Sequence, residues 1–315
     1  MSALLRVSLR QLEYFVAVGT LGTMGAAASE CQVSQSAISL AVSDLERALN
    51  VQLFLRQKAK RLQLTAAGRQ VLADARRLLV QAEELQSTAR SLGGDATGQL
   101  VVGCFPSLSS YVMPTVLDAL AREHPGMDVQ FVEGSVAELQ GWLHDGTCEV
   151  AVMYGGMGSM GGAASLETTD LYLVRPHVEL ATDHPLAARR RVRLAKLADE
   201  PMILLDVPPS EQLFRGVLAE AGVTPKIARR VVSVDGVRAL VATGRGYTVL
   251  LQRPIVAVAP IGLEVAVCEI VEPVSPVAVQ LVRAAATRPT RRAEAFSDIC
   301  RRFLHEGVRR TGIED

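Results

Sequence analysis

A short run of hydroxyl and amide side chains, from Ser34 to Ser43, is the chemically most informative part of this 315-residue chain. Apolar residues recur there in steps of three and four, which predicts a helix with one buried and one polar face. Small hydroxyls and an amide can hydrogen bond to base edges in a DNA major groove, chiefly near the helix N-terminus. The predicted DNA-binding residues here are Thr23, Ser34, Gln35, Ser36, Ser39 and Ser43, of which Gln35, Ser36 and Ser39 are expected to read bases.

Four positive charges follow within six residues, between two short apolar segments. This pattern predicts a β-hairpin with a basic tip, or wing. Such a tip would neutralise DNA phosphates and supply affinity that does not depend on base sequence. The predicted phosphate-binding residues are Arg56, Lys58, Lys60 and Arg61.

Capped helices must position these side chains. Thr23 can cap one short helix, and Ser34 can cap the next after only a few residues. Two capped helices joined by a tight turn form a helix-turn-helix. A preceding helix starts at Ser8, where Gln11 completes a capping box. We expect a winged helix-turn-helix domain over residues 1–65; the alternative is an ordinary helical hairpin whose outer face is merely solvated.

One long helix is predicted over residues 66–92, because Thr65 can cap it and no proline interrupts it. Its apolar residues alternate steps of three and four, as in a coiled-coil seam, although the same pattern would serve a helix packed on its own chain. The predicted dimerisation residues are Ala75, Leu78, Ala82, Leu85, Ala89 and Leu92. The glycine-rich residues 93–98 then predict a hinge.

Residues 99–315 alternate apolar strands with amphipathic helices, which predicts an α/β domain with a parallel sheet. We expect lobe I to comprise residues 99–165 and 267–315, and lobe II residues 166–266.

Polar residues follow two of these strands, at the edge where open α/β sheets bind ligands. Serine hydroxyls and helix N-termini there favour a small anion or carboxylate, although simple N-capping would explain the serines as well. The predicted effector-contacting set is Ser107, Leu108, Ser109, Ser110, Gly134, Ser135, Tyr154, Asp206 and Pro208.

Bulk properties exclude several other classes of protein. Net charge is zero overall, although residues 1–65 carry seven Lys and Arg against four acids. The start lacks an apolar signal region and no apolar run approaches a membrane span, so a cytoplasmic protein is expected. Five scattered cysteines and single histidines indicate neither a disulfide framework nor a metal site. Gly156–Gly161 spells GxGxxG, but no helix follows, so no nucleotide cofactor is predicted.

The stretches SQSAIS (34–39), LE (45–46), LF (53–54) and LTAAG (64–68), with DHPLA (183–187) and LADEPMILLD (197–206), resemble the LysR-type transcriptional regulators. The resemblance covers essentially the whole chain. It implies a two-lobed effector domain like a periplasmic binding protein, a dimerisation helix and an oligomer on an inverted-repeat operator. An effector between the lobes would change the placement of the DNA-binding domains.

The sequence departs from the family pattern on the recognition helix. Ser36 replaces a common proline, and Leu40 and Ser43 stand where basic side chains are frequent. These differences leave base preference open and move phosphate binding onto the wing.

Expected partners are double-stranded DNA, a small effector such as a carboxylate, and further copies of the chain as a homodimer or homotetramer. RNA polymerase is a further option. Two alternative functions remain open: a thiol-based redox regulator that uses Cys104 with Cys148 or Cys268, and a metabolic enzyme on a doubly wound sheet. No catalytic residues are predicted, because the sequence identifies no general base that could activate a nucleophilic side chain.

Overall fold

The computed structural model describes residues 7–56, 61–90, 96–156, 166–285 and 288–310. The side chains of 56, 87–90 and 305–310 are not described. The chain forms two compact units, Met1–Asp95 with Trp142–Cys148 and Ala96–Gly141 with Glu149–Asp315. No helix among the described residues is long and apolar enough to cross a membrane.

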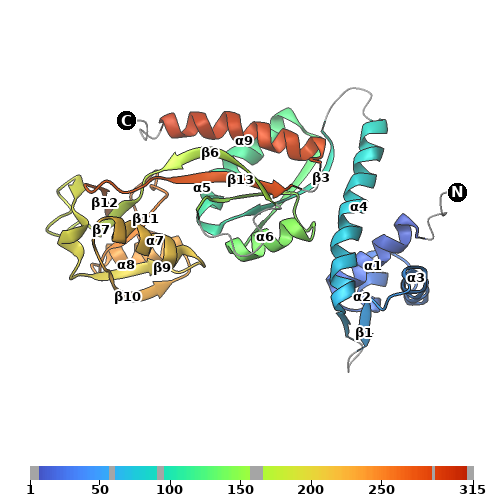
Figure 1. Ribbon diagram of the computed structural model, residues 1–315. Coiled ribbons are helices and arrows are strands. Elements are labelled where there is room, and N and C mark those ends of the chain that lie inside the picture. Colours follow the sequence, from blue (N-terminus) through green and yellow to red (C-terminus); the bar gives the residue numbers. More distant parts are fainter. Residues whose placement is uncertain (1–6, 57–60, 91–95, 157–165, 286–287, 311–315) are drawn as a thin grey trace. The chain divides into compact units, whose positions relative to one another are not determined.

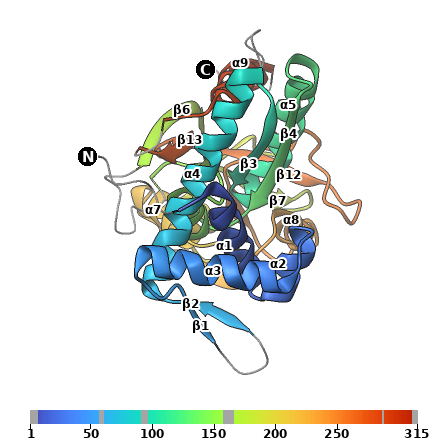
Figure 2. The same cartoon turned by 90° about the vertical axis from the view of Figure 1, so that its right-hand side faces the viewer.

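The first unit is a winged helix-turn-helix. Its elements are α1 (Leu9–Leu21), α2 (Met24–Glu30), α3 (Gln35–Leu49), β1 (Phe54–Arg56), β2 (Leu62–Leu64) and α4 (Ala66–Arg90). The caps predicted at Ser8, Thr23 and Ser34 are confirmed, since each hydroxyl accepts a hydrogen bond from a first-turn amide. The antiparallel hairpin of β1 and β2 lies beside α3 (Figure 2). Its core centres on Phe15, which meets Phe54 edge-on at 5.4 Å between ring centroids.

Two contacts hold the wing against the helices. The Glu46 carboxylate, on α3, accepts hydrogen bonds from the amides of Leu53 at 2.7 Å and Phe54 at 3.2 Å. The Leu53 carbonyl in turn accepts from the Thr65 amide at 2.9 Å, just before α4. Gly68 lets α4 approach, because a Cβ there would lie 2.1 Å from the Leu53 oxygen. The wing is therefore fixed at its base by α3 and by α4.

Lobe I of the second unit is a five-stranded sheet in the order β4-β3-β5-β13-β6. Its strands are β3 (Gly98–Cys104), β4 (Met127–Glu133), β5 (Val150–Tyr154), β6 (Leu166–Val174) and β13 (Val277–Ala284). Helices α5 (Pro106–Glu123) and α9 (Arg291–Arg310) cover one face and α6 (Val136–His144) the other (Figure 1). The strands β3, β4 and β5 are parallel, so their carboxyl ends share one edge.

Lobe II contains a four-stranded sheet, β11-β7-β12-β8, and a parallel pair, β9 and β10. The strands are β7 (His177–Ala181), β8 (Arg191–Val192), β9 (Pro201–Leu205), β10 (Lys226–Val231), β11 (Thr248–Leu250) and β12 (Val265–Ile270). The helices are α7 (Ser210–Glu220) and α8 (Val234–Ala242), with a short 3-10 turn at Leu194–Leu197. Since β7 runs antiparallel to both β11 and β12, the expectation of a wholly parallel sheet was wrong here.

The predicted lobe boundaries at 166 and 267 were also wrong. β6 pairs with β13 from Leu166 to Val174 and so belongs to lobe I. β12 pairs with β7 and so belongs to lobe II. The chain therefore crosses between lobes at 175–176 and again at 271–276, because strand pairing rather than sequence order decides which sheet a strand joins.

Replacing Gly68 with alanine should destabilise the winged domain by about 1–3 kcal/mol, because the new methyl group meets a backbone oxygen that cannot rotate away. Hydrogen exchange of α1 to α3 amides in the full chain measures this loss. Gly25→Ala in α2 is the matched control, since its Cβ would come no closer than 4.0 Å, to Gln35 Oε1. Equal protection in the two variants would contradict the tight contact at Gly68.

Candidate DNA-binding surface and effector pocket

The outer face of α3 is polar and accessible. Gln35, Ser36 and Ser43 are exposed and Ser39 is half-buried, whereas Ile38, on the opposite face, is fully buried. Leu40 is exposed between them. The helix therefore presents hydroxyls and one amide around a single apolar side chain, a surface suited to base edges and thymine methyls.

Two of the predicted DNA-binding residues serve as helix caps. Thr23 Oγ1 accepts from the Ala26 amide at 3.2 Å and Ser34 Oγ from the Ala37 amide at 3.2 Å. The Ser34 and Ser36 hydroxyls also lie within hydrogen-bonding distance, at 2.9 Å. Capping places Ser36 at the N-terminus of α3 and leaves Gln35 as the longest exposed polar side chain of its first turn.

The wing is described only in part. Arg61 is exposed just before β2. Lys58 and Lys60 lie outside the described residues, and so does the side chain of Arg56.

A pocket lies between the lobes and is lined by Ser107 and Tyr154 of the predicted set. Their hydroxyl oxygens are 3.3 Å apart. Burial raises the pKa of Tyr154 above its usual range, so the phenol stays protonated and can donate a hydrogen bond. The pocket has a volume of only about 10 Å³, so a ligand larger than a water molecule requires side chains to move.

Three helices begin at this pocket, a feature that sequence reasoning missed. Ser107 is in the first turn of α5, Ser210 starts α7 and Val234 starts α8. Helix N-termini carry partial positive charge and amides without helical partners, so three of them favour an anion. The other lining residues that the prediction omitted are Phe105, Leu205, Leu213, Phe214, Leu250, Leu251 and Gln252. The strand-end rule applied to β9 and β11 points to Leu205, Leu250, Leu251 and Gln252, but not to Leu213 and Phe214, which lie within α7.

The remaining predicted effector residues do not line this pocket. Ser109 Oγ donates to the Pro106 carbonyl at 3.0 Å, and Ser135 shares a capping box with Glu138, whose carboxylate accepts from the Ser135 hydroxyl at 2.7 Å. Asp206 forms an ion pair with Arg230 at 3.5 Å. Leu108 and Gly134 are buried, while Ser110 and Pro208 are exposed. Residues 157–162 of the glycine-rich stretch 155–162 lie outside the described residues.

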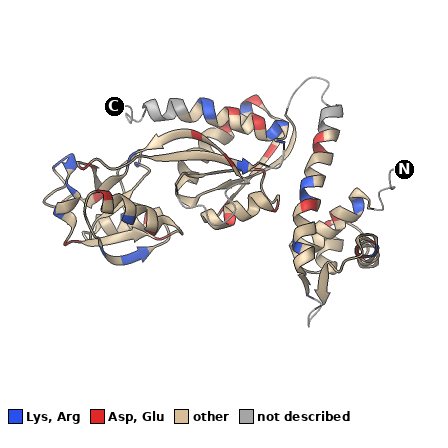
Figure 3. Cartoon of the chain, viewed as in Figure 1, with Lys and Arg blue, Asp and Glu red and all other residues tan. Residues whose placement is uncertain are grey.

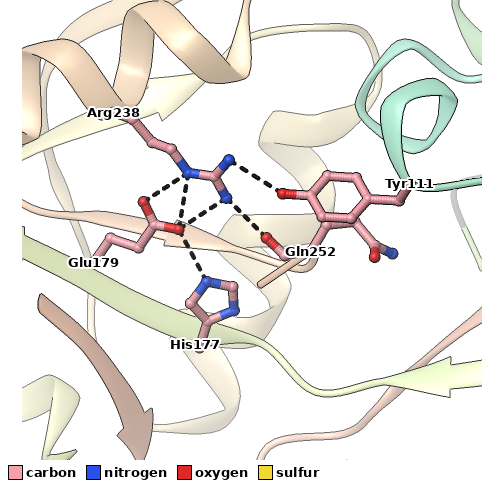
Figure 4. A network of polar contacts seen from close by, with 5 residues as sticks. All are labelled: Tyr111, His177, Glu179, Arg238 and Gln252. Carbon is pink, nitrogen blue, oxygen red and sulfur yellow. Dashed lines mark hydrogen bonds and ion pairs between the residues drawn. The ribbon is translucent and has the colours of Figure 1, made fainter. Parts of the chain in front are cut away.

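A buried network next to the pocket joins the lobes (Figure 4). The Arg238 guanidinium, on α8, donates to the Glu179 carboxylate of β7 at 3.0–3.2 Å and to Tyr111 Oη of α5 at 3.1 Å. Burial alone would raise the pKa of Glu179, but hydrogen bonds from His177 and Arg238 outweigh it and hold that pKa below its usual range. Arg238 also donates to the Gln252 carbonyl at 2.9 Å, at the pocket wall.

The predicted dimerisation seam divides into two parts. Ala75 is buried in the core of its own winged domain, so its assignment to an intersubunit seam was wrong. Leu78 is 56% exposed, Leu85 is 72% exposed and Ala82 is half-buried. Leu92 lies outside the described residues, as does the side chain of Ala89. Residues of both charge signs occur along α4 (Figure 3). Leu78 and Leu85 are large apolar side chains exposed on the same helix.

The three cysteines of the predicted redox alternative are not exposed to solvent. Cys104, Cys148 and Cys268 are buried. Burial raises the pKa of the Cys104 thiol, with a further contribution from Glu133, and burial also raises that of Cys268. A raised pKa reduces the fraction of thiolate, the nucleophilic form that attacks peroxide. Among the described residues no group of His, Cys, Asp and Glu could hold a metal ion.

A winged helix-turn-helix joined to a two-lobed α/β domain is the architecture of a ligand-responsive transcriptional regulator. Residues 9–69 match the family model described as bacterial regulatory helix-turn-helix protein, lysR family, and residues 93–304 match the LysR substrate binding domain. The chain therefore belongs to the LysR-type transcriptional regulators.

Individual relatives agree. The chain is 28% identical to the uncharacterized HTH-type transcriptional regulator YvbU of Bacillus subtilis, over 78% of this chain and 81% of that protein. Among solved structures it resembles HinK, a LysR family regulator of Pseudomonas aeruginosa, with 32% identity, TM-score 0.62 and coverage of 95% and 99%. It also resembles full-length OxyR C199D of the same organism, with 26% identity, TM-score 0.75 and coverage of 94% and 98%.

Proposed function

We propose that the first turns of α3 read an operator in double-stranded DNA while the wing binds phosphate. The observation that carries this is the exposed polar face formed by Gln35, Ser36 and Ser43 beside the basic hairpin. Because α3 has no exposed cation in its first two turns, base contacts must come from hydroxyls and the amide. Thr23 and Ser34 cap the two helices, and Ser39 lies half-buried on the same face of α3. The positive charge of the wing comes from Arg56, Lys58, Lys60 and Arg61.

Gln35→Ala should weaken binding to the preferred operator, selected by sequencing bound DNA, by about 1–3 kcal/mol and leave random DNA nearly unaffected. Electrophoretic titration of both DNAs at one salt concentration measures this. Gln70→Ala removes the same side chain from an exposed position of α4 and should change neither. Equal losses on both DNAs would mean that Gln35 does not read bases.

We infer further that Leu78, Ala82 and Leu85 pack against the same helix of a second copy, with Ala89 and Leu92 continuing the seam. Two exposed leucines one heptad apart lose little by staying in water singly, but a paired helix would bury both. The chain then acts as a homodimer or a homotetramer, as an inverted-repeat operator requires. Contact with RNA polymerase and a cytoplasmic location belong to the same proposal.

Leu78→Glu should abolish dimerisation and operator binding together, since it places an unpaired charge where a partner closes. Sedimentation velocity reports the assembly. The exposed position of Leu78 means that the monomer fold should survive, which circular dichroism checks. Gln70→Glu adds the same charge to α4 away from the seam and should leave the dimer intact. A Leu78→Glu dimer of normal stability would refute the seam.

The effector proposed for the interlobe pocket is a small carboxylate. Three helix N-termini and the Ser107 and Tyr154 hydroxyls support it. Regulation rather than catalysis is the proposed role of this domain. The thiol-based alternative is disfavoured by the raised pKa of the Cys104 and Cys268 thiols.

A carboxylate found by thermal-shift screening should bind about 2–10-fold more weakly to Ser107→Ala, the loss of one ordinary hydrogen bond. Ser109→Ala is the matched control, because that hydroxyl bonds to Pro106 outside the pocket lining. Isothermal titration gives both affinities. Weaker binding only in Ser109→Ala would move the effector out of this pocket.

A further inference from the structure

A second, larger cavity lies at the junction of the lobes and has no role in the function proposed above. It has a volume of about 350 Å³ and is walled by the first crossover, at 175–176, and by the second, at 271–274. It shares only Leu251 with the interlobe pocket. We call it the hinge cavity.

Three guanidinium groups line the hinge cavity, from Arg175, Arg191 and Arg253, against two carboxylates. One of these, Glu272, is occupied, since it accepts a hydrogen bond from the Leu194 amide at 3.1 Å. No partner for Arg175 is found in the part of the chain that the structure describes, and its side chain is exposed. Positive charge therefore exceeds negative charge at this site.

The remaining carboxylate, Glu269, forms only long ion pairs with two of the arginines. Glu269 lies 3.7 Å from Arg191 Nε and 3.9 Å from Arg253 Nη2, within ion-pair range but beyond hydrogen-bonding distance. The side chains are 66%, 56% and 32% exposed for Arg191, Glu269 and Arg253 respectively. Exposed pairs of this length contribute little stability, so an incoming anion has little to displace.

The hinge cavity also has apolar lining residues. Among them Pro176, Leu251 and Ile270 are buried. Carbon packs well on such a surface while planar guanidinium groups bind carboxylates in pairs of hydrogen bonds. The combination favours a compact carbon skeleton that carries two or three acidic groups, over a single inorganic ion.

We propose that the hinge cavity binds a small di- or tricarboxylate, held by Arg175 and Arg253 with Arg191 at the rim. Because both crossovers contribute walls, the bound anion contacts the two segments whose conformation sets the angle between the lobes. A ligand there shifts the lobe arrangement to the extent that it binds one arrangement better than the other. The site would thus let a second metabolite modulate the response to the first.

Isothermal titration with citrate, against sodium chloride of equal ionic strength, tests the proposal on the full-length chain. Saturable citrate binding is expected. Arg175→Gln and Arg253→Gln should each weaken it on the order of tenfold, because each removes a charge-assisted hydrogen-bonding group. Arg175 is exposed, and Arg253 loses only its ion pair of 3.9 Å with Glu269, so both variants should keep the parent melting temperature without citrate.

Two controls separate this site from general charge and from the interlobe pocket. Arg229→Gln removes an exposed arginine from β10 of the same lobe, outside the cavity, and should leave citrate affinity unchanged. Ser107→Ala should also leave it unchanged, whereas a ligand in the interlobe pocket would respond to Ser107→Ala and not to Arg175→Gln.

Hydrogen exchange locates the ligand without a mutation. Citrate should slow exchange in peptides that cover 271–274 and the end of β11. The proposal is overturned if citrate shows no saturable binding at millimolar concentration, if Arg175→Gln and Arg253→Gln bind as the parent does, or if protection falls on other segments.

Discussion

The ion pair between Arg238 and Glu179 is the constraint on which the ligand-binding unit depends. Both groups are almost fully buried, and each would be costly to bury alone. Breaking such a pair by removal of one partner typically costs about 3–5 kcal/mol. Arg238 is thereby held rigid on α8, and its remaining donors are aimed at Tyr111 across the lobe boundary and at the Gln252 carbonyl. The Gln252 segment, which lines the interlobe pocket, is therefore held in place by Arg238.

The winged domain depends on a second constraint, the fixed position of the wing relative to α3. The first two turns of α3 carry no Lys or Arg, so in the proposed mode of DNA binding α3 reads the base sequence and the wing supplies affinity. The separation works only if the wing keeps a fixed relation to α3. Glu46 supplies this relation with two backbone hydrogen bonds, and Gly68 supplies the space for α4 to close on Leu53. A neutral molecule with a locally basic edge can then bind DNA without strong attraction to every polyanion.

The sequence predicted local structure well because caps and periodicity are local. Ser8, Thr23 and Ser34 start their helices as expected, and Asn50 ends α3 in a left-handed conformation. Prediction failed where long-range pairing decides: β6 joins lobe I because β13 returns to it from more than 100 residues away. It failed similarly for Ala75, whose helix period suits a partner helix or the domain core equally well.

The same limit explains why the effector set was only partly matched to the pocket. Ser107 and Tyr154 follow the strand-end rule, but Ser210 and Val234 come from a lobe whose position no local pattern fixes. Likewise Arg175, Arg191 and Arg253 are dispersed over 79 positions of sequence and converge only because two crossovers meet. Because the three arginines are far apart and belong to no sequence motif, their proximity could not be predicted from the sequence.

The arrangement of the two cavities bears on how much energy a regulatory ligand must supply. Reversing a two-state equilibrium from 1:99 to 99:1 takes about 5.5 kcal/mol of differential binding. Within the buried network the hydrogen bond from Arg238 to Tyr111 crosses between the lobes, and a charge-assisted bond of this kind contributes about 1.5–3 kcal/mol. The ion pair itself lies wholly within lobe II and need not break when the lobes move. A small anion that gains two or three such bonds in one arrangement is therefore sufficient to change the populations. The two cavities share Leu251, so a ligand in either contacts the same segment after β11.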